Sequence, residues 1–213
     1  MKRRVAMLLL VAAAAFGGGA LVSARPDGTA GVDASGQPQV KRFDGVRAIA
    51  PFSLTDHRGQ RFDRERLIGR WTLITFGFTN CPDACPTMLT NLAEVRKSLP
   101  GGWEGPEPQF VLVSVDPRRD TQQVLAQYVP AFDATFLGVT GTQAEVDRVH
   151  ADFGGAHRIP RGASAHYSVD HSVLLYVVDP EGRLHAQIAP PFDPAGVARK
   201  IARDARAFAS AKG

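Results

Sequence analysis

The sequence predicts an α/β fold in which a central mixed sheet is flanked by helices. An apolar run from Trp71 to Phe78 is rich in the β-branched and aromatic residues that favour buried strands. A run with apolar residues at helical spacing, Thr87 to Leu99, follows it, and a second apolar run extends from Gln109 to Asp116. Strand, helix and strand in this order predict a right-handed βαβ unit with two parallel strands.

An N-terminal hairpin is expected before this unit. The domain is predicted to begin near Ile49, and the polar turn Thr55 to Gln60 separates its first apolar stretch from Arg61-Phe62. Asp63 stands where it can cap a short helical turn toward Leu67.

A helix–strand–helix insertion is expected after the βαβ unit. Its members are a helix from Thr121 to Val129, a short strand from Thr135 to Val139, and a helix from Thr142 to Phe153. Thr142 and Glu145 have the spacing of a capping box. The segment from Gly154 to Asp170 shows no periodicity, so we expect a long loop there.

The C-terminal part predicts two more strands and a closing helix. The strands are Ser172 to Val178 and Arg183 to Ile188, joined by the turn Asp179 to Gly182, and the helix runs from Asp193 to Ala209. A βαβ half, an insertion, two strands and a helix follow one another as they do in the thioredoxin fold. We therefore expect residues 49–213 to form one thioredoxin-like domain.

The first 24 residues predict a membrane anchor or a signal peptide. Lys2, Arg3 and Arg4 precede 18 residues without a charge, Val5 to Val22, and Val22-Ser23-Ala24 resembles a cleavage site. In both interpretations the rest of the chain leaves the cytoplasm. Residues 25–48, rich in Gly, Ala, Asp, Ser and Pro at their start, are expected to be a flexible linker.

The charge balance gives little support to nucleic-acid binding. The net charge of +4 comes from 25 basic and 21 acidic residues, and removing the three basic residues at the N-terminus leaves 22 against 21. A nearly neutral domain without a basic run interleaved with aromatic residues is not typical of a nucleic-acid-binding protein.

The only two cysteines, Cys81 and Cys85, lie where the first core strand is followed by a helix. We expect Pro86 to be the first helical residue, which places both thiols on a turn at the helix entrance. A helix N-terminus lowers the pKa of a thiol. This position therefore favours reactive or metal-binding sulfur over inert core sulfur, and two thiolates are ligands for Cu(I) or zinc.

A third metal ligand would have to come from elsewhere in the fold. Of the six histidines, His57 is expected to be a solvated turn residue, His150 and His157 to be surface residues, and His185 to face solvent or a polar group. His166 and His171 flank a short segment before a predicted strand that should neighbour the cysteine-bearing strand. His171 is the candidate ligand, against the alternative of a satisfied structural histidine.

Other chemistries compete for the cysteine pair. A thiol–disulfide oxidoreductase would use the same two sulfurs without metal. Peroxide reduction would need an activating arginine beside Thr79 and Cys81, and no such partner is evident. A structural disulfide over so short a loop would constrain little chain. Asp83 is expected to be a turn residue, and Asp116 a strand-end residue with an outer-shell or partner-contact role as the weaker alternative.

Several motifs resemble those of the Sco/SenC family of copper proteins, in family order from about Phe52 to Pro190. They are Leu54-Thr55-Asp56 with Gly59, Phe76-Gly77-Phe78-Thr79, Cys81-Pro82-Asp83 with Cys85-Pro86, Val115-Asp116-Pro117 with Arg119-Asp120-Thr121, Gly138 to Gly141, Val169-Asp170-His171-Ser172, and Asp179-Pro180 with Gly182.

The resemblance implies a thioredoxin-like domain that binds one copper ion through Cys81, Cys85 and His171. This ligand set suits Cu(I) and can also hold Cu(II). It further implies an assembly factor, and not a turnover enzyme, for the dinuclear copper centre of cytochrome c oxidase subunit II. The protein would act as metallochaperone, as thiol reductant of the target's cysteines, or as both. We expect a monomer on the bacterial inner membrane, with its domain in the periplasm and a copper donor protein as second partner.

Overall fold

The computed structural model describes residues 40–43, 47–101, 103, 105–160 and 167–211. The expected anchor or signal peptide at 1–24, the linker up to residue 39, and His166 lie outside the described residues. Within the described ranges, no helix has the length and apolar character needed to cross a membrane.

The described strands form one large mixed sheet and one small ribbon. The eight-stranded sheet has the order β1-β10-β9-β4-β5-β6-β2-β3, and β7 and β8 form the two-stranded ribbon. Only the β4–β5 and β5–β6 pairs of the large sheet are parallel. The bounds are β1 (Val40–Arg42), β2 (Ser53–Asp56), β3 (Arg61–Asp63), β4 (Thr72–Gly77), β5 (Gln109–Ser114), β6 (Leu137–Thr140), β7 (His157–Arg158), β8 (Asp170–His171), β9 (Leu175–Val178) and β10 (Leu184–Ile188).

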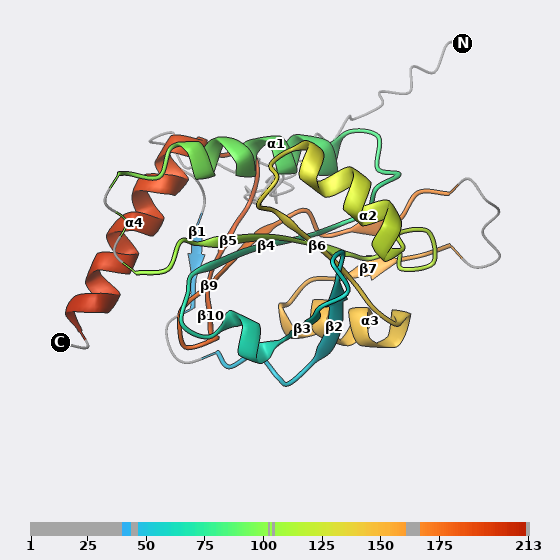
Figure 1. The fold of residues 1–213 in the computed structure, drawn as a ribbon, viewed down its shortest axis with the longest axis horizontal. Helices are drawn as coiled ribbons and strands as arrows, with labels where there is room; N and C mark the ends of the chain where they lie inside the picture. Colours follow the sequence, from blue (N-terminus) through green and yellow to red (C-terminus); the bar gives the residue numbers. More distant parts are fainter. Residues whose placement is uncertain (1–39, 44–46, 102, 104, 161–166, 212–213) are drawn as a thin grey trace, which may run out of the picture.

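Helices cover both faces of the sheet. Figure 1 shows α1 and α2 above the sheet and α3 below it. Adjacent residues of β4 point to opposite faces, so Leu73 packs with α1 and α4, whereas Ile74 and Phe76 pack with α3. The bounds are α1 (Ala84–Lys97), α2 (Gln122–Tyr128), α3 (Gln143–Asp152) and α4 (Pro194–Ser210), with short 3₁₀ turns at η1 (Arg64–Leu67) and η2 (Val129–Ala131).

The predicted α/β architecture is confirmed. The β4–α1–β5 unit, the β2–β3 hairpin, and the α2–β6–α3 insertion all form, and β9 lies beside β4 as expected. Several strand ends differ from their expected positions: β9, for example, begins at Leu175 instead of Ser172. The sheet also extends into the range expected to be linker, because β1 pairs Val40 with Ile188 on the β10 edge.

Helix α1 begins earlier than the sequence predicts. It starts at Ala84, so Cys85 and Pro86 lie inside its first turn, and the prediction that both thiols precede the helix is wrong for Cys85. The first-turn N–H groups of a helix have no intrahelical acceptor, so the missing N–H of Pro86 costs no helical hydrogen bond. The N–H of Thr87 makes a backbone hydrogen bond of helical spacing, to Asp83 O at 3.1 Å.

Helix α3 forms only half of the expected capping box. The Thr142 hydroxyl accepts a hydrogen bond from the Glu145 N–H, as predicted. The Glu145 carboxylate, however, accepts from the backbone N–H of Ser53 at 2.7 Å and pairs with Arg148. Glu145 therefore joins α3 to the start of β2 instead of closing its own helix end.

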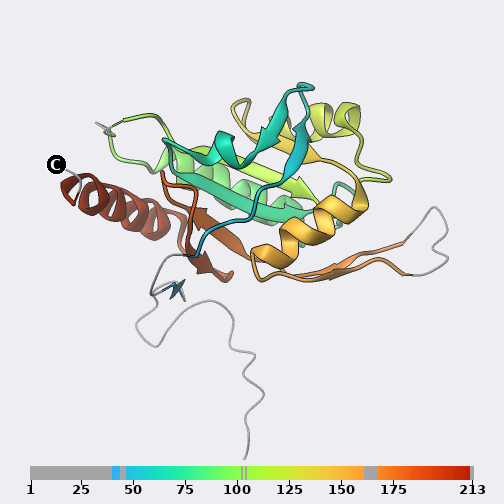
Figure 2. The ribbon, with the colours of Figure 1, turned by 90° about the horizontal axis from the view of Figure 1, so that it is seen from below.

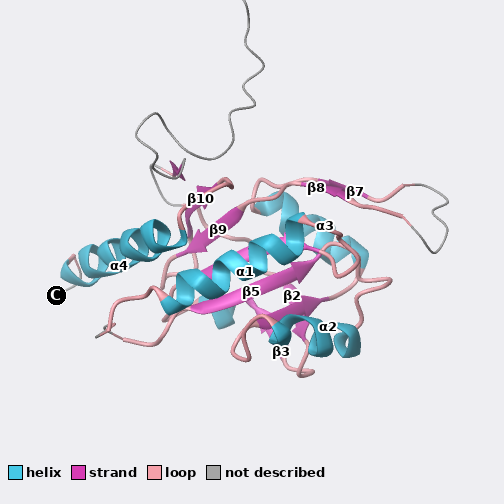
Figure 3. Cartoon of the chain, turned by 90° about the horizontal axis from the view of Figure 1, so that it is seen from above, coloured by secondary structure: helices cyan, strands magenta, loops and turns pink. Residues whose placement is uncertain are grey.

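The segment predicted to be a long loop contains the β7–β8 ribbon. His157 lies opposite His171 and Arg158 opposite Asp170. Figures 2 and 3 show that the ribbon extends away from the body of the domain. A two-residue strand carries too few positions for a periodic pattern, which is why this pairing was not predicted. Its consequence is that His171 lies on a paired strand.

Candidate metal centre

Cys81 and Cys85 lie between the end of β4 and the first turn of α1. Cys81 is half-buried and Cys85 is 4% exposed, and both are free thiols. The backbone N–H of Cys85 donates a hydrogen bond to Cys81 Sγ at 3.3 Å. This hydrogen bond fixes the Cys81 sulfur beside the first turn of α1.

The His171 imidazole meets the Cys85 thiol at the end of β8. The distance from Cys85 Sγ to His171 Nε2 is 3.6 Å, and His171 Nδ1 lies 3.1 Å from Val169 O. A carbonyl oxygen only accepts hydrogen bonds, so Nδ1 carries the ring proton and the lone pair of Nε2 faces the sulfur. Burial also lowers the pKa of His171. The ring is therefore neutral and has the tautomer that a metal ion requires of Nε2.

The Cys85 thiol differs from its sequence-based expectation. Burial raises the pKa of Cys85, although the residue lies in the first turn of α1. The helix end was expected to lower this pKa, but in the metal-free protein the apolar surroundings outweigh it. Metal binding through Cys85 would therefore displace a proton from the sulfur.

Cys85 contacts each of the other two predicted ligands. Within the described part of the chain, no three His, Cys, Asp or Glu side chains are gathered closely enough to form a complete metal cage. Cys85 contacts His171 through its sulfur and Cys81 through its backbone N–H. The donor types, two sulfurs and one neutral imidazole nitrogen, fit a soft metal ion such as Cu(I).

The remaining described histidines lie elsewhere, and three of them differ from expectation. His57 is a half-buried acceptor and not a solvated turn residue: its Nδ1 accepts from the Gly138 N–H at 3.0 Å. His185 faces a polar group, as expected, with Nε2 at 3.0 Å from Asp204 Oδ2.

His150 and His157 are not surface side chains. His150 is fully buried and stacks on Phe76, with ring centroids 4.1 Å apart. Its Nδ1 lies 2.9 Å from His157 Nδ1, and His157 Nε2 lies 2.9 Å from Asp147 Oδ1. His150 follows the buried positions Val146 and Val149 at helical spacing, a signal that could have placed it on the inner face of α3.

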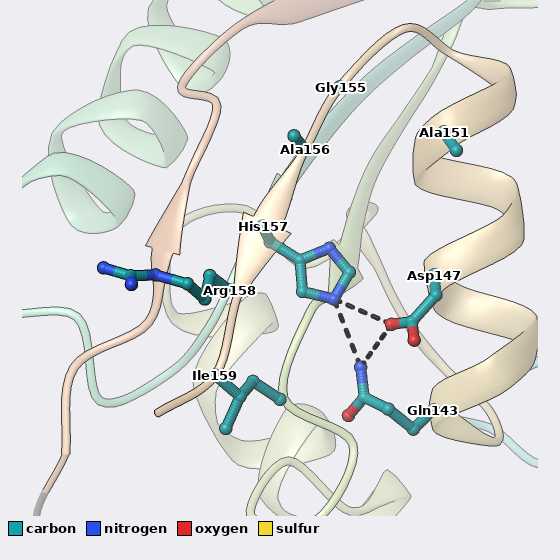
Figure 4. A pocket seen from close by; sticks show the side chains of 8 residues that line it. All are labelled: Gln143, Asp147, Ala151, Gly155, Ala156, His157, Arg158 and Ile159. Carbon is teal, nitrogen blue, oxygen red and sulfur yellow. Dashed lines mark hydrogen bonds and ion pairs between the residues drawn. The ribbon is translucent and has the colours of Figure 1, made fainter. Parts of the chain in front are cut away.

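His157 lines a groove of about 500 Å³ together with residues of α3 (Figure 4). Figure 4 shows the His157 ring turned toward Asp147 and Gln143 of α3. The His157 side chain is only 7% exposed because these contacts hold it against the helix.

The buried His150 is expected to make the fold acid-sensitive. Burial lowers the pKa of His150 to about 3, whereas the unfolded value is 6.5. Between these values the unfolded chain binds the extra proton, so stability falls as the pH decreases from about 6.5 toward 3. One such group contributes roughly 1 kcal/mol of unfolding free energy per pH unit.

The measurement is urea unfolding at several pH values from 7 to 4, on the wild type and on His150→Phe. The substitution keeps an aromatic ring on Phe76 but removes the titrating group. The wild type should lose stability faster than the variant. Two parallel stability curves would contradict the prediction.

Two buried carboxylates follow β5, and only one of them, Asp116, was considered from the sequence, with an outer-shell role as its weaker alternative. Asp120 accepts hydrogen bonds from the Thr79 N–H at 3.0 Å and from the Thr79 and Ser114 hydroxyls at 2.6 Å each. Burial raises the pKa of Asp120. Asp116 accepts from the Tyr167 hydroxyl at 2.7 Å and pairs with Arg119. Asp116 therefore makes contacts that a residue serving only to end a strand does not need, and these contacts favour its outer-shell alternative.

Known proteins are similar to this chain over most of the described domain, including the candidate metal centre. The SCO1/SenC family model matches residues 41–206. The human mitochondrial SCO1 homologue is 38% identical over 137 residues, which are 62% of this chain and 44% of that protein. The match covers about half the length of this human protein and of the mitochondrial SCO homologues from zebrafish and mouse.

Two solved structures with copper bound have the same fold. ScoI of Arabidopsis thaliana is 32% identical, with a TM-score of 0.68 over 75% of this chain and 99% of that chain. ScoI of Bradyrhizobium japonicum is also 32% identical, with a TM-score of 0.65 over 73% of this chain and 98% of that chain. The thioredoxin-like fold predicted from the order of elements agrees with these structures.

Proposed function

The chain belongs to the SCO1/SenC family, and from this premise we propose that it carries one copper ion on Cys81, Cys85 and His171. We further propose that it delivers this ion to the dinuclear copper centre of cytochrome c oxidase subunit II. Copper is then the cargo of the protein, and the three side chains hold it between a donor protein and the target.

One observation carries the ligand assignment most strongly. The lone pair of His171 Nε2 faces Cys85 Sγ at 3.6 Å, although 86 positions separate the two residues in the chain. The bond from Nδ1 to Val169 O holds the ring in this tautomer before any metal binds. A structural histidine that was satisfied by the protein alone would not need to present an unprotonated nitrogen to a thiol.

The exposure of the ligands suits metal transfer. Cys81 is half-buried, and His171 lies on the projecting β7–β8 ribbon, so ligands of a partner protein can approach one side of the site. A three-ligand site leaves room for an incoming fourth ligand, whereas a closed four-ligand site holds its metal for structure.

The test is a Cu(I) titration of the reduced full-length chain against a chromophoric chelator of known affinity. We expect one equivalent of tightly bound Cu(I), and weaker binding by His171→Ala. His185→Ala is the matched control, because that histidine contacts Asp204 and not the thiols. Equal affinity of the wild type and His171→Ala would refute the three-ligand assignment.

A second candidate function, thiol–disulfide exchange, is favoured by the different exposure of the two cysteines. The half-buried Cys81 thiolate can attack a partner's disulfide, forming a mixed disulfide and releasing one partner thiol. The buried Cys85 then attacks Cys81 Sγ, which forms a Cys81–Cys85 disulfide and releases the second partner thiol. The two electrons pass to the partner, whose cysteines must be reduced before they can bind copper.

We place the site outside the cytoplasm in this proposal. Residues 1–24 would hold the protein at the bacterial inner membrane, either permanently or until cleavage, with the domain in the periplasm. The copper donor and subunit II would then meet a monomeric domain on that side of the membrane.

A further inference from the structure

We propose that the segment from Asp116 to Asp120 positions both halves of the proposed copper site. The cysteine half is Cys81 with Cys85, the histidine half is His171, and one buried carboxylate of the segment serves each half. The inference rests on the proposed function, because it assigns this segment a role in aligning Cys81, Cys85 and His171. The segment follows β5, contains none of the three proposed ligands, and contacts the chain shortly before Cys81 and shortly before His171.

Asp120 holds the cysteine half. Its carboxylate accepts from both the backbone N–H and the hydroxyl of Thr79, two residues before Cys81. The Ser114 hydroxyl at the end of β5 donates to the same carboxylate. The chain is thus tied to the core at the point where it leaves β4 and turns toward Cys81. Asp120 is fully buried, so these donors replace the water that its carboxylate would otherwise bind.

Asp116 and Arg119 hold the histidine half. Tyr167 lies four residues before His171, and its hydroxyl donates to Asp116 Oδ1 at 2.7 Å. Arg119 Nη1 donates to the Tyr167 backbone oxygen at 3.0 Å, and Arg119 Nε pairs with Asp116. Both the side chain and the backbone of Tyr167 are therefore fixed to the segment.

Packed side chains also connect Arg119 to the proposed ligand His171. The Arg119 guanidinium lies 3.6 Å from the centre of the Tyr167 ring and 5.7 Å from the centre of the Phe78 ring. The Phe78 ring in turn meets the His171 ring edge-on, with centroids 5.5 Å apart. A guanidinium is attracted to the face of an aromatic ring, and an edge-to-face pair of rings is a favoured packing geometry. The segment therefore reaches His171 both along the chain and through packed side chains.

These contacts make Tyr167 a positioning residue for His171. Without the Tyr167–Asp116 hydrogen bond, the strand that carries His171 loses a connection to the core, and the imidazole contacts Cys85 less often. Losing an outer-shell partner typically weakens metal binding by about 10-fold to 100-fold. Tyr167→Phe keeps the ring on Arg119 and removes only the hydroxyl, so we expect about the lower of these effects.

The test uses the full-length chain with Tyr167→Phe, and with Tyr176→Phe as the matched control. The Tyr176 hydroxyl is buried and has no hydrogen-bond partner among the described residues, so its loss removes no such contact. Tyr167→Phe should weaken Cu(I) binding by about 10-fold, as one outer-shell contact would, and Tyr176→Phe should not. In the metal-free reduced protein, iodoacetamide should also label Cys85 faster in Tyr167→Phe, because His171 covers that sulfur, while labelling of Cys81 stays unchanged.

Combining Tyr167→Phe with His171→Ala separates positioning from general loosening of the fold. If Tyr167 acts through His171, Tyr167→Phe has no further effect on Cu(I) affinity or on Cys85 labelling once His171 is alanine. Effects that persist undiminished in that background, or wild-type behaviour of Tyr167→Phe alone, would overturn the inference. Faster Cys85 labelling in a chain that binds no copper would overturn the proposed function and leave the positioning role intact.

Discussion

Cys85→Ser is expected to abolish tight Cu(I) binding while the domain stays folded. Serine has nearly the same shape, so the buried first turn of α1 can keep its packing. The oxygen, however, is a hard and protonated donor, whereas Cu(I) prefers a thiolate. The loss should exceed the about 100-fold effect of removing an outer-shell partner, because a direct ligand is replaced. The measurement is the chelator competition assay, with urea unfolding to verify the fold.

Met88→Leu is the matched control for this substitution. Met88 is a buried sulfur residue one turn further along α1, and leucine fills a similar volume. The control should bind Cu(I) as the wild type does. Cu(I) binding by Cys85→Ser at wild-type affinity would remove Cys85 from the ligand set.

The same variant also separates the two candidate functions. If the protein reduces a partner's disulfide, Cys85→Ser should trap a mixed disulfide on Cys81, because the resolving thiol is gone. Cys81→Ser should trap none, since the more exposed, attacking sulfur is missing. If copper delivery alone is the function, the two variants should lose copper equally and neither should accumulate a mixed disulfide.

The parts of the fold that the sequence predicted depend on local patterns. The apolar run of β4 and the helical spacing in α1 each lie within one element, so periodicity reveals them. The Asp63 cap of η1 and the Thr142 cap of α3 need only two nearby residues and also form as predicted. The ribbon residues 157–158 and 170–171 could not be found in this way, because their pairing joins segments that are each too short for a pattern.

The three proposed ligands were chosen from the sequence, whereas the side chains that surround them could not be. Cys81 and Cys85 were identified from their spacing, whereas His171 needed the family motifs as well as its place before a strand. The Thr79–Asp120 and Asp116–Tyr167 contacts span 41 and 51 positions, and no spacing rule reveals them. Cys85 lies buried inside α1, which begins two residues before the expected start at Pro86, so an error at one helix end changed the expected pKa of a proposed ligand.

Gly155→Ala is expected to destabilise the whole domain, although alanine is only one methyl group larger. A Cβ at this position would lie 2.0 Å from His150 Nε2 and 2.7 Å from the Tyr176 hydroxyl. The His150 ring cannot simply move away, because it is fully buried and stacked on Phe76. Overpacking of this kind costs about 3 kcal/mol. For a domain of this size, the melting temperature should fall by roughly 10 °C.

The control is Gly101→Ala, where the added Cβ would meet no atom within 4 Å. Its stability should equal or slightly exceed that of the wild type, because alanine reduces the freedom of the unfolded chain. Pairing Gly155→Ala with His150→Ala identifies the cause, since removing the imidazole opens the space that the new methyl group needs. The double variant should then be more stable than the sum of the two single effects predicts. Purely additive losses would place the cost of Gly155→Ala in the backbone and not in the packing against His150.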